Sequence, residues 1–265
     1  MRLVVKLEDE KGFDITIIGG HDKDGNPEDL NLTIYSGEVV SIVGPTGSGK
    51  SQLLGDIEWM AQKDTPTGRK ILINGQVPDV EKRFDIDSKL VAQLSQNMNF
   101  VMDVTVKEFV EIHASSRKIE DSEEVIEAII TQANQLAGEE FLEDTPITSL
   151  SGGQSRALMI ADTAYLSKSP IVLIDEIENA GIDRKSALDL LVKREKIILM
   201  ATHDPILALM GDKRLVIKNG GINKIIESTA AERKNLVLLE KLDKKLLMMR
   251  NKLRNGEIID CIGWE

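Results

Sequence analysis

Residues 44–51 read GPTGSGKS, and further along the chain residues 150–154 read LSGGQ. The first stretch follows the apolar run Val39–Val43 and precedes apolar residues that recur at helical spacing from Leu53 to Ala61. A glycine-rich turn between a buried strand and a helix is typical of a phosphate-binding loop, because its backbone N–H groups can point inward at phosphate oxygens. This segment therefore predicts an α/β fold organised around a P-loop.

The apolar runs along the chain extend this prediction. Val39–Val43, Ile171–Ile174 and Ile197–Ala201 predict buried strands that alternate with helical patterns, so we expect a P-loop NTPase core with a largely parallel sheet. The first forty residues contain LVVKL, FDITII and DLNLTIY around the turn-like GGHDKDGNP, which predicts an N-terminal antiparallel β region. Helical patterns, clearest at Val106–His113 and Ser122–Leu136, predict an inserted helical subdomain over about 97–168.

Composition limits the functional classes. The chain has 265 residues, which suits one domain of moderate size (1–228) with an appended element (229–265). A net charge of −11 argues against a broad nucleic-acid-binding face, so we expect no nucleic-acid partner. The single cysteine, Cys261, fits a reducing compartment. With no apolar signal core at the N-terminus and no long apolar stretch, we expect a cytoplasmic protein, peripheral on the cytoplasmic membrane face only through a partner.

The P-loop and a later acidic strand end together predict Mg-ATP binding. The loop residues expected to bind nucleotide are Gly44, Pro45, Thr46, Gly47, Ser48, Gly49, Lys50, Ser51 and Gln52. Lys50 is expected to contact the β- and γ-phosphates, and the hydroxyl of Ser51 to bind Mg²⁺. The run IVLIDE at 171–176 ends in two carboxylates: Asp175 can hold Mg²⁺ through a water, and Glu176 can polarise the attacking water.

With LSGGQ added, the chain resembles the ATP-binding cassette (ABC) family over roughly residues 1–225. In that family Ser151, Gly152 and Gly153 form a turn that opens a helix near Gln154, and this helix N-terminus faces the γ-phosphate bound by the other protomer. The resemblance therefore implies a nucleotide-dependent dimer, either a homodimer or a heterodimer with another ABC subunit.

Two further motifs resemble functional loops of the family. Gln96, in LSQNMNF, resembles the glutamine loop that senses Mg²⁺, and Gln93 is a rival whose spacing fits less well. His203, in MATHD after the strand Ile197–Ala201, resembles the switch histidine that contacts the γ-phosphate and assists the catalytic Glu176.

Three positions depart from the family pattern. Gln52 stands where the family usually has threonine, and Asp183 lies one position further on than usual in the D-loop, the interface segment after Glu176. The aromatic residue on which the family stacks adenine is replaced, counting back from Lys50, by His21, with Phe13 as a less suitable alternative.

The segment after Ser228 has a different character. Leu239, Leu242, Leu246, Met249 and Leu253 step by 3 and 4 residues, and we call this set the heptad stripe. Eight basic residues against three acids give 231–254 a net charge of +5. Three interpretations stay open: the stripe packs on the protein's own core, it contacts a partner or twin chain, or it contacts a membrane. The ending GEIIDCIGWE is strand-like.

The sequence thus predicts a Mg-dependent ATPase of the ABC type, with ATP sandwiched between the P-loop of one protomer and LSGGQ of the other. Two processes could use the ATP-driven closure of the two protomers. In the first, the chain energises a membrane transporter through a separate membrane permease. In the second, it is a soluble ATPase that drives conformational change in a client protein, such as a metalloenzyme or a metal-cluster assembly partner.

Overall fold

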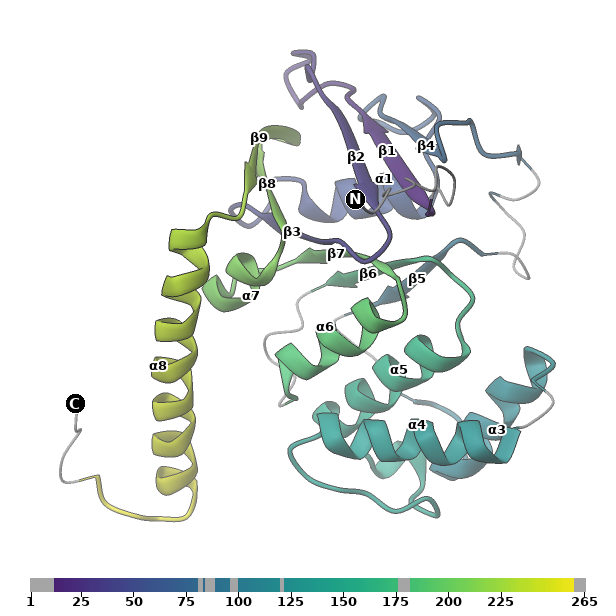
Figure 1. The fold of residues 1–265 in the computed structure, drawn as a ribbon, viewed down its shortest axis with the longest axis vertical. Coiled ribbons are helices and arrows are strands. Elements are labelled where there is room, and N and C mark those ends of the chain that lie inside the picture. Colours follow the sequence, from purple (N-terminus) through teal and green to yellow (C-terminus); the bar gives the residue numbers. More distant parts are fainter. Residues whose placement is uncertain are drawn as a thin grey trace, which may run out of the picture.

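The computed structural model describes residues 12–80, 83, 89–95, 100–119, 122–175 and 182–259. Figure 1 shows two sheets and a helical layer, with one long helix projecting from them. The strands are β1 (Asp14–Ile18), β2 (Asn31–Tyr35), β3 (Val39–Val43), β4 (Lys70–Ile73), β5 (Val91–Leu94), β6 (Ile171–Asp175), β7 (Ile197–Ala201), β8 (Lys213–Lys218) and β9 (Gly221–Glu227). The helices are α1 (Lys50–Glu58), α3 (Val106–Ser116), α4 (Ser122–Leu136), the 3₁₀ turn η1 (Ile147–Ser149), α5 (Gly152–Leu166), α6 (Arg184–Lys193), α7 (Pro205–Met210) and α8 (Ala230–Arg254).

The larger sheet has the order β5-β6-β7-β3-β8-β9 and confirms the predicted largely parallel core. Every neighbouring pair is parallel except β8 and β9, which are antiparallel. The carboxyl ends of β3, β6 and β7 lie at the same edge, because β7 pairs with both β3 and β6. The P-loop follows β3, Asp175 ends β6 and His203 follows β7, so the sheet brings these predicted residues together at one edge.

The smaller sheet is antiparallel, with the order β2-β1-β4. Residues 12–40, the described part of the first forty, supply two of its strands. The third, β4, comes from beyond α1, and Ile71 of β4 pairs with Ile17 of β1. The predicted strand LVVKL lies outside the described residues. The antiparallel region is therefore confirmed, but it takes a strand that the sequence pattern did not assign to it.

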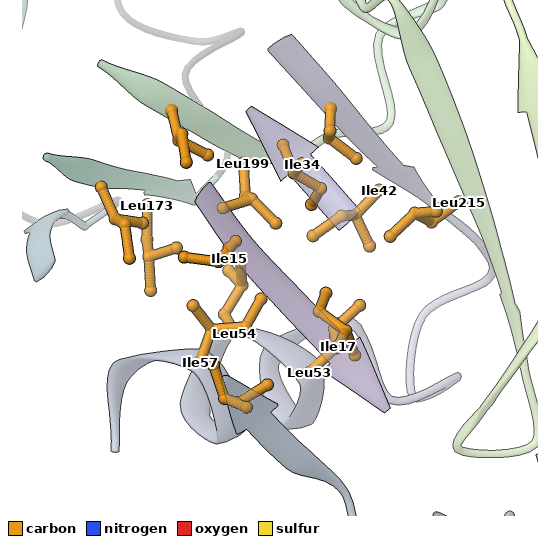
Figure 2. Close-up of a cluster of buried hydrophobic side chains, with 14 of the residues drawn as sticks. Ile15, Ile17, Ile34, Ile42, Leu53, Leu54, Ile57, Leu173, Leu199 and Leu215 are labelled. Carbon is orange, nitrogen blue, oxygen red and sulfur yellow. The ribbon is translucent and has the colours of Figure 1, made fainter. Parts of the chain in front are cut away.

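One aliphatic core joins the two sheets and α1. Figure 2 shows its side chains, which come from the small sheet, from α1 and from the large sheet (Ile15, Ile17, Ile34; Leu53, Leu54, Ile57; Ile42, Leu173, Leu199, Leu215). All ten are at most 2% exposed. Burying aliphatic side chains of this size stabilises the fold by about 1.5–3 kcal/mol each. This packing fixes α1, and with it the P-loop, against the parallel sheet.

Helices α3, α4 and α5 pack on one another around a separate apolar cluster that includes Val106, Ile129 and Leu158. This is the predicted helical region, drawn in teal below the sheet in Figure 1. Helix α3 begins with a capping box in which the Thr105 hydroxyl accepts from the backbone N–H of Glu108. None of the helices among the described residues has the length and apolarity needed to cross a membrane.

Only the first residues of the predicted strand-like ending are described. Gly256, at φ +75°, closes α8 with a backbone hydrogen bond from its N–H to the carbonyl of Leu253. Residues 257–259 then form no strand. Cys261 and the rest of the ending lie outside the described residues.

Candidate nucleotide site

The P-loop connects β3 to α1 through backbone conformations that require glycine. Gly49, the residue before α1, has φ +110°, and a Cβ atom there would lie 2.8 Å from the Cα of Gly220. A Cβ on Gly44 would lie 2.5 Å from the carbonyl oxygen of Ile217. Within the described part of the chain, no side chain caps α1, so its first N–H groups stay available to an anion.

Lys50 is the centre of the polar contacts in this loop. Its side chain is buried, and Nζ donates to the carbonyl oxygens of Gly44 (2.9 Å) and Pro45 (3.3 Å). Nζ also lies 3.2 Å from Nε2 of His203. Because an ammonium group can only donate, His203 accepts here in the tautomer whose Nε2 carries no proton. The P-loop lysine and the proposed switch histidine are therefore direct neighbours.

A cavity of about 480 Å³ lies in front of the loop. Its lining includes nine of the predicted site residues (His21, Thr46, Gly47, Gly49, Lys50, Ser51, Gln52, Asp175 and His203). Gly44, Pro45 and Ser48 are not part of this lining: the carbonyl oxygens of Gly44 and Pro45 accept from Lys50, and Ser48 is buried. Among the two adenine-stacking candidates, the structure places His21 at the cavity, while Phe13 packs against the hydrophobic core.

Sequence reasoning missed Lys23, which lies two residues after His21 in the same loop. Its Nζ donates to the carbonyl oxygen of Gly47 at 2.9 Å, and the residue lines the cavity. The cavity thus has two ammonium groups, Lys23 and Lys50, and each is held by P-loop carbonyls. A concave surface lined by positive groups favours a polyphosphate anion. The sequence did contain a signal for Lys23, because this lysine lies in the same loop as His21, the predicted adenine-stacking residue.

A buried ion cluster, also missed, supports the walls of the cavity. The guanidinium of Arg69 is fully buried; it binds Glu28 (2.7 Å) and Asp56 of α1 (2.8 Å), and donates to the carbonyl of Gly220 (2.7 Å). Burial raises the pKa of Glu28, but hydrogen bonds from Arg69, Ile222 and Gly20 outweigh it, and the pKa lies below its ordinary value. The cluster joins three segments: the His21 loop through Glu28, helix α1 through Asp56, and the turn at Gly220, which packs against Gly49.

Ser51 and Asp175, both predicted metal ligands, line the same cavity. Hydroxyl and carboxylate oxygens are the donors that Mg²⁺ prefers, so these two residues fit the predicted ion. The other predicted residues, Glu176 and Gln96, lie outside the described residues. Gln93, the rival of Gln96, lies in β5 with its amide beside the carboxylate of Glu58, and it does not line the cavity.

The LSGGQ segment lies at the start of α5, and a capping box fixes the N-terminus of this helix. Ser151 is the N-cap: its hydroxyl accepts from the N–H of Gln154, while the side-chain carbonyl of Gln154 accepts from the N–H of Ser151. Ser151 and Gly152 are exposed, and none of the residues 151–154 lines the cavity. The capped helix N-terminus is therefore presented to solvent and not to the chain's own P-loop cavity.

Asp183 and Asp204 are the N-caps of helices α6 and α7. Asp183 accepts from the N–H groups of Lys185 and Ser186 and so caps the start of α6. Asp204, next to His203, caps α7 in the same way. Arg184 binds Asp204 through Nη1 at 2.5 Å and Asp243 of α8 through Nη2. The switch loop is thereby connected to α8 through one guanidinium.

Comparisons with known proteins agree with this site. A family model described as "ABC transporter" matches residues 27–179. An ABC transporter ATP-binding protein of Methanocaldococcus jannaschii is 54% identical over 245 residues, which are 92% of this chain and 94% of that protein. The petrobactin import ATP-binding protein of Bacillus anthracis is 33% identical over 207 residues, which are 73% of this chain and 72% of that protein.

Solved structures show the same fold. A dimeric ATP-binding cassette bound to ADP and inorganic phosphate in a post-hydrolysis state matches with a TM-score of 0.61. The match covers 82% of this chain and 99% of that one at 22% sequence identity.

Proposed function

Because the chain belongs to the ABC transporter family, we propose that it is the ATP-hydrolysing subunit of a membrane transporter. As an ABC ATPase it binds and hydrolyses ATP. The observation that carries the proposal is the cavity in which the P-loop, Asp175 and His203 come together from three parallel strands.

Each group at the cavity has a role that follows from its chemistry. The N–H groups at the start of α1 and the ammonium of Lys50 bind the β- and γ-phosphates, and Lys23 adds a second positive charge. His203, beside Lys50, contacts the γ-phosphate, and His21 lies where it can stack on adenine. Glu176 polarises the attacking water. Catalysis here consists of positioning and electrostatic stabilisation of the transferred phosphoryl group.

Mg²⁺ is the proposed metal. Ser51 and Asp175 would hold it, together with Gln96, and bound there it would neutralise charge on the phosphates. The fit depends on the oxygen donors that Ser51 and Asp175 contribute to the cavity next to the P-loop.

Two chains are proposed to form the complete site. Ser151, Gly152 and Gly153 begin a helix whose N-terminus is suited to an anion, yet they do not line the chain's own cavity. In a head-to-tail pair, homodimeric or heterodimeric, this N-terminus meets the γ-phosphate on the partner's P-loop. ATP then closes the pair, and hydrolysis reopens it.

The work is proposed to be done on a separate membrane subunit, which places the chain in the cytoplasm at the inner membrane face. Relatives with printed roles support this choice; the Bacillus anthracis protein, for instance, is named for petrobactin import. The alternative, a soluble ATPase acting on a metalloenzyme or metal-cluster client, has no comparable support.

Capture of the chain from detergent-solubilised membranes of its native host tests the transporter role. We expect a protein with several membrane spans to co-purify in a constant ratio, and ATP turnover of the chain to rise in that complex. The matched control is Lys50→Ala, which removes turnover but leaves the surface intact. Constant-ratio recovery of a soluble metalloprotein, with no membrane protein, would favour the alternative.

A further inference from the structure

The loop that carries His203 is fixed by hydrogen bonds on both sides of the histidine. Before it, the backbone N–H of Thr202 donates to the carbonyl of Ile42 in β3 at 3.1 Å. After it, the backbone N–H of Asp204 donates to the hydroxyl of Thr202 at 2.9 Å. These bonds close a tight turn around His203, whose Nε2 lies 3.2 Å from Nζ of Lys50. The direction of the imidazole therefore depends on how residues 202 and 204 are held.

Asp204 divides its carboxylate between two elements. Oδ1 accepts from the backbone N–H groups of Ile206 and Leu207 at 2.7 and 3.1 Å, and so caps α7. Oδ2 accepts from Nη1 of Arg184 at 2.5 Å, and both of these side chains are 18% exposed. A hydrogen bond between two charged groups is stronger than a neutral one, so Arg184 fixes the residue that follows His203.

Arg184 is itself held on two sides. It is the first residue of α6, and its Nη2 binds the carboxylate of Asp243 in α8. With its two terminal nitrogens on two different carboxylates, the planar guanidinium has a restricted orientation. The next residue, Lys185, offers a contrast: its ion pair also joins α6 to α8, through Glu240 at 3.6 Å, but it does not involve Asp204.

We propose that Arg184 is a positioning residue for ATP hydrolysis. By holding Asp204, it keeps the imidazole of His203 in the direction from which it contacts the γ-phosphate. The inference rests on the role proposed for His203 above. Misplacing a group by about 1 Å can cost about a hundredfold in rate, so the hold on this loop affects turnover. Asp243 steadies the guanidinium, and the pair with Asp204 carries the effect.

Steady-state ATP turnover of the full chain at saturating Mg-ATP tests the proposal. Arg184→Ala should lower kcat about tenfold, yet change the Kd for ATP, measured by calorimetry, by less than about threefold, because the P-loop is untouched. Arg184→Lys restores a cation but not the guanidinium fork, and should recover part of the turnover. Arg184→Gln keeps the length of the side chain without its charge, and it repeats the test if Arg184→Ala does not fold.

Two control variants separate positioning from a purely structural role, which would be to attach α8 to the body. Asp243→Asn removes the link from Arg184 to α8 but leaves the pair with Asp204. Lys185→Ala removes another link between α6 and α8. Because neither change touches Asp204, both should keep kcat within about twofold of the native chain.

A double variant gives a readout that attachment of α8 would not change. His203→Ala removes the group that Arg184 is proposed to position. Adding Arg184→Ala to His203→Ala should therefore lower kcat no further, whereas two independent effects would multiply.

Three results overturn the inference. The first is a native kcat in Arg184→Ala beside a lowered kcat in His203→Ala. The second is an equal loss in Asp243→Asn, which would assign Arg184 to the attachment of α8. The third is multiplication of the two losses in the double variant. A native kcat in His203→Ala is a different failure, because it overturns the role proposed for His203 and this inference with it.

Discussion

Arg69 shows how much of the nucleotide site depends on a residue that does not face the nucleotide. Its guanidinium is fully buried between Glu28, which follows the His21 loop, and Asp56 of α1. It also holds the carbonyl of Gly220, whose Cα packs where Gly49 has no Cβ. Through these contacts the guanidinium of Arg69 stabilises the shape of the P-loop.

Arg69→Met is expected to destabilise the fold strongly. The substitution leaves Glu28 and Asp56 buried without their cation, and breaking a buried ion pair in this way costs about 3–5 kcal/mol. For a domain of this size each kcal/mol lowers Tm by about 2–4 °C, so calorimetry should show a fall of roughly 10 °C. The control is Arg233→Met, whose exposed pair with Asp212 should contribute at most about 1 kcal/mol. Equal Tm values for the two variants would contradict this account of the cluster.

At the residue scale, local patterns identified residues that the fold brings to one cavity, but they did not identify their distant partners. Lys50 and Ser51 were predicted from the P-loop, Asp175 from the acidic end of an apolar strand, and His203 from its resemblance to the switch histidine. The parallel sheet gathers these positions at one edge. Arg69 gave no such signal, because its partners Glu28 and Asp56 are brought to it only by tertiary packing. Whether each predicted residue acts as proposed stays a prediction until it is substituted.

At the scale of elements, α8 is attached to the body by ion pairs more than by apolar burial. Leu242, Leu246 and Leu253 in its lower half are exposed. Arg184 connects Asp243 to Asp204, which follows His203. Hydrophobic periodicity predicted the helix and its stripe, but it could not tell which side would face the body. That side was decided by Glu232, Glu240 and Asp243, which find cations on β8 and α6.

Truncation after Ser228 is expected to leave the ATPase core folded. The exposed stripe contributes little burial, and the lost ion pairs are partly exposed, so each contributes at most about 1 kcal/mol. We expect Tm to fall by less than about 5 °C and the Kd for ATP, measured by calorimetry, to change by less than about threefold. An insoluble product, or a much larger fall in Tm, would show that α8 is part of the fold.

At the scale of the whole molecule, the chain carries the two separate elements of the proposed two-chain site. The P-loop cavity holds the cationic groups, while the capped N-terminus of α5 lies elsewhere and is exposed. The fold class followed from the sequence because strand and helix patterns alternate regularly around the P-loop. The pairing of two chains could not follow in the same way, since it depends on surfaces and not on periodicity; it came from the resemblance to the family.

Light scattering of the Glu176→Gln chain with and without Mg-ATP tests the two-chain site most directly. Loss of this general base should cut turnover at least about a hundredfold while leaving ATP bound. We predict a monomer without nucleotide and a dimer with it. Adding Gly153→Asp, which places a carboxylate against the partner's γ-phosphate, should abolish the dimer and leave ATP binding by each chain unchanged. A dimer that survives Gly153→Asp, or ATP binding that is lost with it, would contradict a site completed by the second chain.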